Sequence, residues 1–137
     1  MVGYVYRNYV SNLNNTFIVV DISEQELTVY DGNKVYLETD VVTGKKGEHD
    51  TPTGMYKMGS KDTDTYLSSQ TYGYNTHVDY WMPFNGGIGL HDAAWRNKFG
   101  GSIYERNGSH GCVNLPHNAA EDIYSHVKRG TKVLVHK

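Results

Sequence analysis

Short strand-like segments joined by turn residues run through most of this chain. Residues 16–21 are rich in β-branched side chains, and residues 26–30 alternate polar and apolar side chains as a half-buried strand does. The Asp31-Gly32-Asn33 turn follows and leads into a third strand-like run at 34–42. We therefore expect the first third of the chain to be a β-meander and the fold to be mainly β.

Strand patterns continue after a segment rich in Gly, Thr and Pro at 43–54. An Asn-Gly-Gly turn joins two of the further strands that we expect, which lie at 55–58, 78–84, 87–91 and 131–136. Residues 59–75 are polar and carry several tyrosines. Because long structureless loops are uncommon in compact domains and are usually functional, we expect this segment to be a flap beside the active site.

One segment near the C-terminus has the pattern of an α-helix. Apolar residues recur at helical spacing between Ala120 and Val127, Pro116 suits the first helical position, and Gly130 suits the residue after the helix end. The sequence therefore predicts one short C-terminal helix in a mainly β fold.

The size and charge of the chain exclude several classes of protein. A length of 137 residues fits one domain, so we interpret residues 1–15 as a linker remnant or N-terminal extension and residues 16–137 as the domain. The formal net charge of −2 provides no basic field for nucleic acid, and no apolar run is long enough for membrane contact. The first 15 residues lack a secretory signal pattern, which predicts either a cytoplasmic protein or a domain of a longer exported parent.

The chemistry of the sequence gathers around its one cysteine, Cys112. A histidine within reach can accept the thiol proton and activate the sulfur as a nucleophile, and both His110 and the upstream His91 are candidates. Gly111 allows the backbone to approach an acyl group closely. The N–H groups of Gly111 and Cys112 are expected to point at a developing oxyanion, which makes acyl transfer the reaction that the pattern favours.

This pattern resembles the signature of the L,D-transpeptidases, the YkuD-type catalytic domains of bacterial cell-wall enzymes. The signature consists of His91 and, after seventeen intervening residues, Ser109-His110-Gly111-Cys112-Val113-Asn114. The resemblance extends to segments 41–44, 51–54 and 80–84, and so covers nearly the entire chain. It implies a β-sandwich or barrel with one short helix.

The resemblance also implies the reaction. A family member attacks the carbonyl of the third residue of a peptidoglycan tetrapeptide stem, releases D-alanine and holds the donor as a thioester. An amine of a second stem, the acceptor, then forms a 3→3 cross-link, whereas water in its place makes the enzyme an L,D-carboxypeptidase. No cofactor or metal is implied. Carbapenem-type β-lactams are the implied inhibitors, and the implied location is the cell wall or periplasm.

Residue by residue, the resemblance makes Cys112 the nucleophile and His91 the general base and acid. The backbone carbonyl of Asp92 is expected to orient His91, while His110 orders the loop and helps Gly111 to form the oxyanion site. The remaining candidates contact the substrate or wall the cleft: Ser109, Asn114, Tyr80 and Trp81.

Asp92 departs from the family pattern, which often has Gly or Ser at this position. Its carboxylate is expected to raise the pKa of His91. It is also expected to cap a short helical turn at 93–96.

Other interpretations of the same residues remain open at this point. Cys112 is an inert buried residue in one of them, and His91 is a structural histidine that leaves His110 as the base in another. The two histidines and the cysteine also match a zinc site in residue type, although no recognised ligand spacing is present. A sortase-like or cysteine-peptidase reaction and a non-catalytic peptidoglycan-binding module complete the alternatives.

Overall fold

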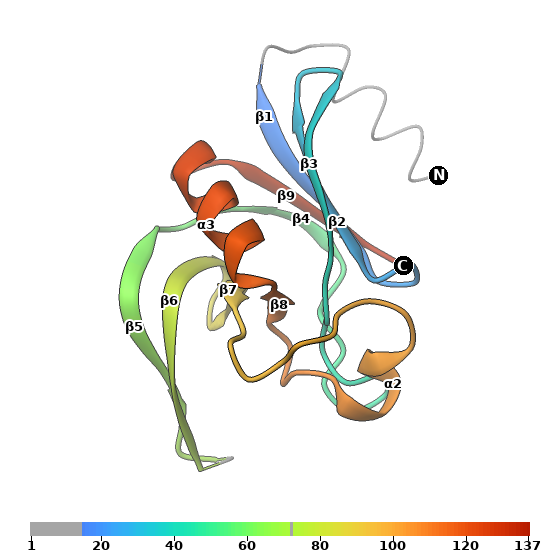
Figure 1. The fold of residues 1–137 in the computed structure, drawn as a ribbon, viewed down its shortest axis with the longest axis vertical. Helices are drawn as coiled ribbons and strands as arrows, with labels where there is room; N and C mark the ends of the chain where they lie inside the picture. Colours follow the sequence, from blue (N-terminus) through green and yellow to red (C-terminus); the bar gives the residue numbers. More distant parts are fainter. Residues whose placement is uncertain (1–14, 72) are drawn as a thin grey trace.

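The computed structural model describes residues 15–71 and 73–137, which form two β-sheets and two helices (Figure 1). The expected linker remnant at 1–15 lies, apart from Asn15, outside the described residues. Among those described, no helix has the length and apolar character needed to cross a membrane. The mainly β class predicted from the sequence is confirmed.

The first sheet has five strands in the order β3-β2-β1-β9-β4. These strands are β1 (Thr16–Asp21), β2 (Glu26–Asp31), β3 (Lys34–Asp40), β4 (Gly54–Lys57) and β9 (Lys132–His136). Strand β1 is antiparallel to β2 and parallel to β9, so the last strand of the chain lies beside the first. The expected turn between β2 and β3 is present, with Gly32 at φ 61°, a conformation that glycine adopts without strain.

The second sheet has four strands in the order β5-β6-β7-β8. They are β5 (Asp62–Ser69), β6 (Tyr74–Asn85), β7 (Ile88–Asp92) and β8 (Val113–Leu115). Helix α2 (Ile103–Asn107) and helix α3 (His117–His126) complete the described elements. Helix α3 contacts β6 and β7 on one side and β3 on the other, and it therefore joins the two sheets (Figure 1).

A single apolar core fills the space between the sheets and α3. Ile18 and Leu27 of the first sheet, Met82 and Leu90 of the second, and Ile123 of α3 are all fully buried members of it. Burying each such side chain stabilises the fold by about 1.5–3 kcal/mol relative to exposure. The core holds β7 and β8 against the rest of the domain, and the site described below lies at these strands.

The expectation of a structureless flap at 59–75 is wrong. Strand β5 pairs with β6 from Asp62↔Trp81 to Ser69↔Tyr74, so most of this segment is a β-hairpin. Most of its side chains are exposed or half-buried, which removes the apolar alternation that marks a strand in a sequence. Asp64 has φ 52° and is left out of the pairing between Thr63↔Tyr80 and Thr65↔Val78, although the register of the two strands is the same on both sides of it.

The helices also differ in part from expectation. Pro116 lies at the N-cap of α3, but the helix ends at His126 and Gly130 lies in the following turn with φ 90°. Helix α2 was not expected from the sequence. Residues 93–96 form a single turn, closed by a hydrogen bond from the Arg96 N–H to the Ala93 carbonyl.

Candidate active site

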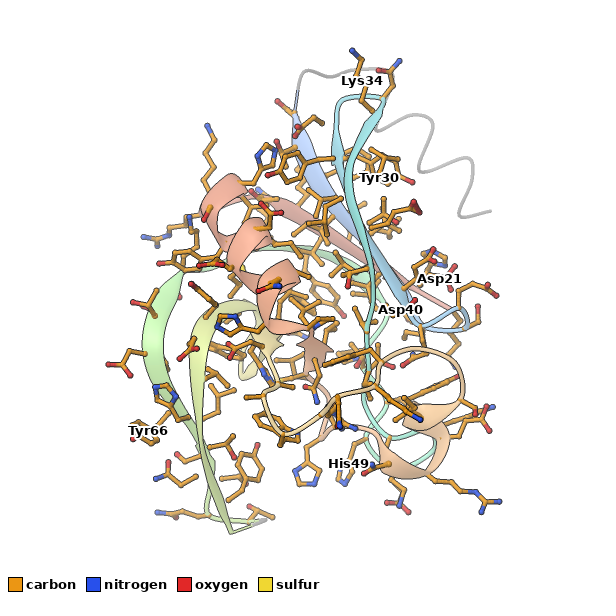
Figure 2. The ribbon with its side chains drawn as sticks, in the orientation of Figure 1. Asp21, Tyr30, Lys34, Asp40, His49 and Tyr66 are labelled. Carbon is orange, nitrogen blue, oxygen red and sulfur yellow. The ribbon has the colours of Figure 1, made fainter. Side chains whose placement is uncertain are left out.

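A cleft of about 640 Å³ lies beside the second sheet. Its walls come from the β5–β6 hairpin, the end of β7 and the chain between 95 and 114. Tyr66, which lines it, lies with His49 at the end of the molecule opposite Lys34 (Figure 2). The hairpin at 62–85 therefore borders the site, as the sequence led us to expect of that segment, but as paired strands.

Parallel pairing of β7 and β8 brings the two signature segments together. Leu90 pairs with Val113 and His91 with Asn114. Cys112 directly precedes β8, so it stands beside the strand that carries His91, and both side chains line the cleft. The seventeen residues that separate the two segments in sequence are thus closed into a loop by one strand pair.

His91 is 4% exposed and has a defined tautomer. Its Nδ1 lies 2.7 Å from the Asp92 carbonyl oxygen, so Nδ1–H donates and Nε2 is the nitrogen available to accept a proton. The rings of Trp81 and Trp95 lie 6.0 Å and 5.8 Å from the imidazole, centroid to centroid. The hydrogen bond from His91 Nδ1–H to the Asp92 carbonyl is the orienting contact that the resemblance implied.

The pKa of His91 is lowered overall, although Asp92 itself raises it, as expected. Burial disfavours the charged imidazolium and outweighs both the hydrogen bond and the charge of Asp92, while the positive charge of Arg96 lowers the pKa further. His91 is therefore a neutral base at rest.

The Asp92 carboxylate binds the backbone of the neighbouring strand β6 and not the turn at 93–96. Its Oδ1 accepts hydrogen bonds from the backbone N–H groups of Asp79 (2.9 Å) and Tyr80 (2.8 Å) on β6. The expected helix cap is absent, because the side chain turns back to the neighbouring strand. Asp92 thus fixes β7 against β6 directly beside His91.

Cys112 is half-buried, and its thiol donates to the Gly87 carbonyl at 3.5 Å. Burial raises the pKa of Cys112 to about 11, although a hydrogen bond from the Gly89 N–H works against this. With a raised thiol pKa and a lowered imidazole pKa, the pair rests as neutral thiol and neutral imidazole.

The loop before Cys112 is held by hydroxyl groups. Ser109 Oγ donates to the Cys112 carbonyl and accepts from the Gly111 N–H at 3.1 Å. Thr51 Oγ1 donates to the Gly111 carbonyl at 2.6 Å and accepts from the Gly44 N–H at 2.9 Å. Because the Gly111 N–H is engaged by Ser109, the expectation that it points at an oxyanion is wrong for this state of the loop.

Gly111 has φ 127°, a region that side chains with a Cβ rarely adopt. A Cβ there would also lie 3.3 Å from Ile88 Cδ1. The glycine of the signature is therefore required by the backbone. Thr51, which holds its carbonyl, was missed as a site residue because only the fold brings it next to the loop.

The other expected site residues are divided between the cleft and the α3 side of β6. His110 lines the cleft and is exposed, with its ring 4.6 Å from His49 and 5.2 Å from Tyr74. Trp81 lines the cleft as expected. Tyr80 does not, because successive strand residues face opposite sides: its hydroxyl donates to Glu121 at 3.1 Å on α3.

Two polar groups at the cleft are buried without a partner in the described residues. Asn114 is 1% exposed; its backbone pairs with Val42, but its Oδ1 has no hydrogen bond. The Nε of Arg96 is likewise buried and has no hydrogen bond within the described residues. Trp95 and Arg96 line the cleft and were missed by the sequence analysis, although their position directly after the His91 segment was available as a signal.

The zinc alternative gains no support from the geometry. In the part of the chain that the structure describes, potential ligand atoms come within 4.8 Å of one another at Asp79, Asp92 and His117, and not at the cysteine. His117 Nε2 lies 2.9 Å from Asp79 Oδ2, which gives these side chains a role as an ion pair.

Residues 15–135 match the family model YkuD, described as the L,D-transpeptidase catalytic domain. This chain belongs to the YkuD family. L,D-transpeptidase 2 of Mycobacterium tuberculosis is 36% identical over 100 residues, which make up 65% of this chain but only 24% of that protein. The YkuD domain described here therefore spans about a quarter of the length of that relative.

Solved structures of YkuD relatives have the same fold. The crystal structure of a cysteine-to-serine mutant of the Enterococcus faecium L,D-transpeptidase superposes with a TM-score of 0.84 at 36% identity, over 90% of this chain and 50% of that one. The NMR structure of the E. faecium catalytic domain acylated by ertapenem has a TM-score of 0.80 at 38% identity, over 90% and 98% of the two chains.

Proposed function

We propose that this YkuD domain is a peptidoglycan L,D-transpeptidase whose nucleophile is Cys112 and whose general base is His91. The observation that carries the proposal is the placement of both residues in one cleft by the β7–β8 pair. The membership of the family and the two E. faecium structures support the same reaction.

The first half-reaction forms a thioester. His91 Nε2 accepts the thiol proton as Cys112 Sγ attacks the carbonyl carbon of the third stem residue. Proton transfer accompanies attack, because neither group is charged at rest. The Cys112 N–H holds the oxyanion, since the Gly111 N–H is already bonded to Ser109. His91 then protonates the nitrogen of the departing D-alanine, and the bond between that nitrogen and the carbonyl carbon breaks.

The second half-reaction decides the product. An amine of an acceptor stem attacks the thioester carbonyl, His91 takes up its proton, and the Cys112 thiol is released with a 3→3 cross-link formed. Water in place of the amine gives the L,D-carboxypeptidase reaction. Because the substrate is the cell wall, we place the working site outside the cytoplasm.

Intact-mass analysis with a carbapenem tests the nucleophile. We expect the wild-type chain to gain the mass of one carbapenem, as the ertapenem-acylated E. faecium domain leads us to propose. The Cys112→Ala chain is expected to gain none. An unmodified wild-type chain, or an adduct that persists in the Cys112→Ala chain, contradicts the mechanism.

Analysis of the products separates the remaining alternatives. Muropeptides incubated with the domain are expected to yield 3→3 dimers by mass spectrometry. Tripeptides without dimers would assign the carboxypeptidase reaction. A non-catalytic peptidoglycan-binding module would retain both stems unchanged.

A further inference from the structure

Arg96 is a cationic side chain of the cleft that the mechanism above does not use. It follows β7 directly after Trp95 and lines the same cleft as His91 and Cys112. Its positive charge also acts on His91, whose pKa it helps to lower. The guanidinium therefore lies near the reacting groups.

The guanidinium has few partners for its five N–H donors. Nη1 donates to the Asn107 carbonyl at 2.8 Å, and Nε is buried without an acceptor among the described residues. Within the same residues no carboxylate lies in ion-pair distance of Arg96. Burial lowers the pKa of Arg96, which reports a half-buried cation with no compensating anion.

The surroundings of Arg96 favour an anionic ligand. The chain contains 15 acidic residues, but none of the residues that line the cleft is Asp or Glu. Buried charges in proteins are normally paired, because removing a charge from water is costly. A ligand carboxylate in this cleft supplies the missing anion, and the planar guanidinium can bind a carboxylate with two parallel hydrogen bonds.

We propose that Arg96 binds the free α-carboxylate of the D-alanine that Cys112 expels, and so makes the domain specific for donor stems that end at the fourth residue. This inference rests on the proposed function. The terminal carboxylate lies one residue from the attacked carbonyl, and only this carboxylate stays so close to the reacting atoms in every bound donor.

Binding to an inactive chain tests the inference without turnover. In the Cys112→Ala background we compare, by calorimetry, a tetrapeptide stem with a free terminal carboxylate and the same stem with a terminal amide. We expect the acid to bind about tenfold tighter or more, the range of a charge-assisted hydrogen bond. Adding Arg96→Gln is expected to weaken binding of the acid and to leave binding of the amide unchanged, which abolishes the preference.

Two further variants separate recognition from structure. Arg96→Lys keeps the charge but loses the bidentate fork, and is expected to restore part of the preference for the acid. Arg129→Gln removes an exposed arginine that does not line the cleft. This variant is expected to keep the full preference for the acid over the amide. Equal binding of acid and amide by the parent chain, or a preference that survives Arg96→Gln, overturns the inference.

Two further experiments identify which carboxylate is bound and test the proposed function separately from the role of Arg96. A stem amidated at its second residue and free at its end is expected to bind like the acid; if that amidation, and not the terminal one, weakens binding, the assignment is wrong. The wild-type chain is tested in parallel for the carbapenem adduct, which reports on Cys112 independently of the preference for the acid. A missing adduct in wild type refutes the proposed function, whereas an adduct without acid preference refutes only the role of Arg96.

Discussion

At the scale of single residues, burial sets the chemistry of the candidate site. The same desolvation that raises the pKa of Cys112 to about 11 lowers that of His91, because both charged forms lose water. Many reactive cysteines rest as thiolates stabilised by a neighbouring cation. In the mechanism that we propose, the Cys112 thiol stays protonated until a substrate arrives, and His91 removes its proton during attack.

Alkylation of Cys112 measures this resting state. Because only about one thiol in ten thousand is ionised at pH 7 when the pKa is about 11, we expect iodoacetamide to react slowly. The rate is expected to rise about tenfold per pH unit up to pH 10. Free cysteine, which levels off above its own pKa, is the control. A rate for Cys112 that is constant between pH 6 and 9 would reveal an ion pair.

The hydroxyl of Thr51 holds the nucleophile loop through one carbonyl. Thr51→Val keeps the shape of the side chain and removes both the bond to the Gly111 carbonyl and the bond from Gly44. We expect a loss of about 1–3 kcal/mol in the free energy of unfolding and slower acylation by a carbapenem, followed by mass. Thr53→Val, at an exposed position, should leave both unchanged; equal effects would show that the loop does not depend on Thr51.

At the scale of elements, the site depends on the contact between β6 and β7. The Asp92 carboxylate binds two backbone N–H groups of β6, next to the residue whose Nδ1 its carbonyl orients. One residue therefore fixes both the strand and the imidazole. A carboxylate at this position, unusual for the family pattern, is explained by this strand-to-strand contact.

Replacement of this carboxylate tests the strand contact. Asp92→Asn is expected to lower the free energy of unfolding by about 1–3 kcal/mol in urea, because the hydrogen bonds from β6 lose their charged acceptor. Asp79→Asn is the matched control: it weakens only the exposed pairs with His117 and His77 and keeps its own backbone N–H. If both variants are equally stable, the contact contributes little.

At the scale of the whole molecule, helix α3 is tied to both sheets by His–Asp pairs. His117 at its start pairs with Asp79 of β6, and His126 at its end lies 2.8 Å from Asp31 of β2. The hydrogen bond from His126 lowers the pKa of Asp31, while the hydrogen bond to Asp79 raises that of His117. The stabilisation from the Asp31 pair is therefore lost as pH falls, and that from the His117 pair is lost as pH rises.

The pH dependence of the melting temperature follows from these two shifts. The contribution of Asp31 is present above its unfolded pKa of 3.8 and is lost as pH falls through the lower folded value. That of His117 is present below its unfolded pKa of 6.5 and is lost as pH rises through the higher folded value. We expect Asp31→Asn to reduce the acid-side fall in Tm and His117→Gln the fall above pH 6.5. Tm profiles parallel to wild type in both variants would refute this account.

Most strands were predictable from sequence because they are short runs rich in β-branched and apolar residues, bounded by turn residues, whether they alternate or are buried on both faces. The first strand of the hairpin at 62–85 escaped prediction because its side chains are mostly exposed and show no apolar alternation. The candidate nucleophile, its candidate base and the glycine between His110 and Cys112 were visible as one motif. Thr51 was not, because only the fold brings it next to the Gly111 carbonyl, whereas Arg96 follows the His91 segment in the sequence and its position there was an unused signal.

The sequence alone predicted the reaction class that we propose, since a single thiol beside His-Gly and an upstream histidine offer a candidate nucleophile, a candidate base and a backbone that can approach a carbonyl. Only the tertiary structure decided how that chemistry is held. It set the charge states, through the burial of Cys112 and His91, and it sent the side chain of Tyr80 away from the cleft. It also left Arg96 in the cleft without an anion. Desolvation and pairing depend on which atoms surround a group, and only the folded chain determines those atoms.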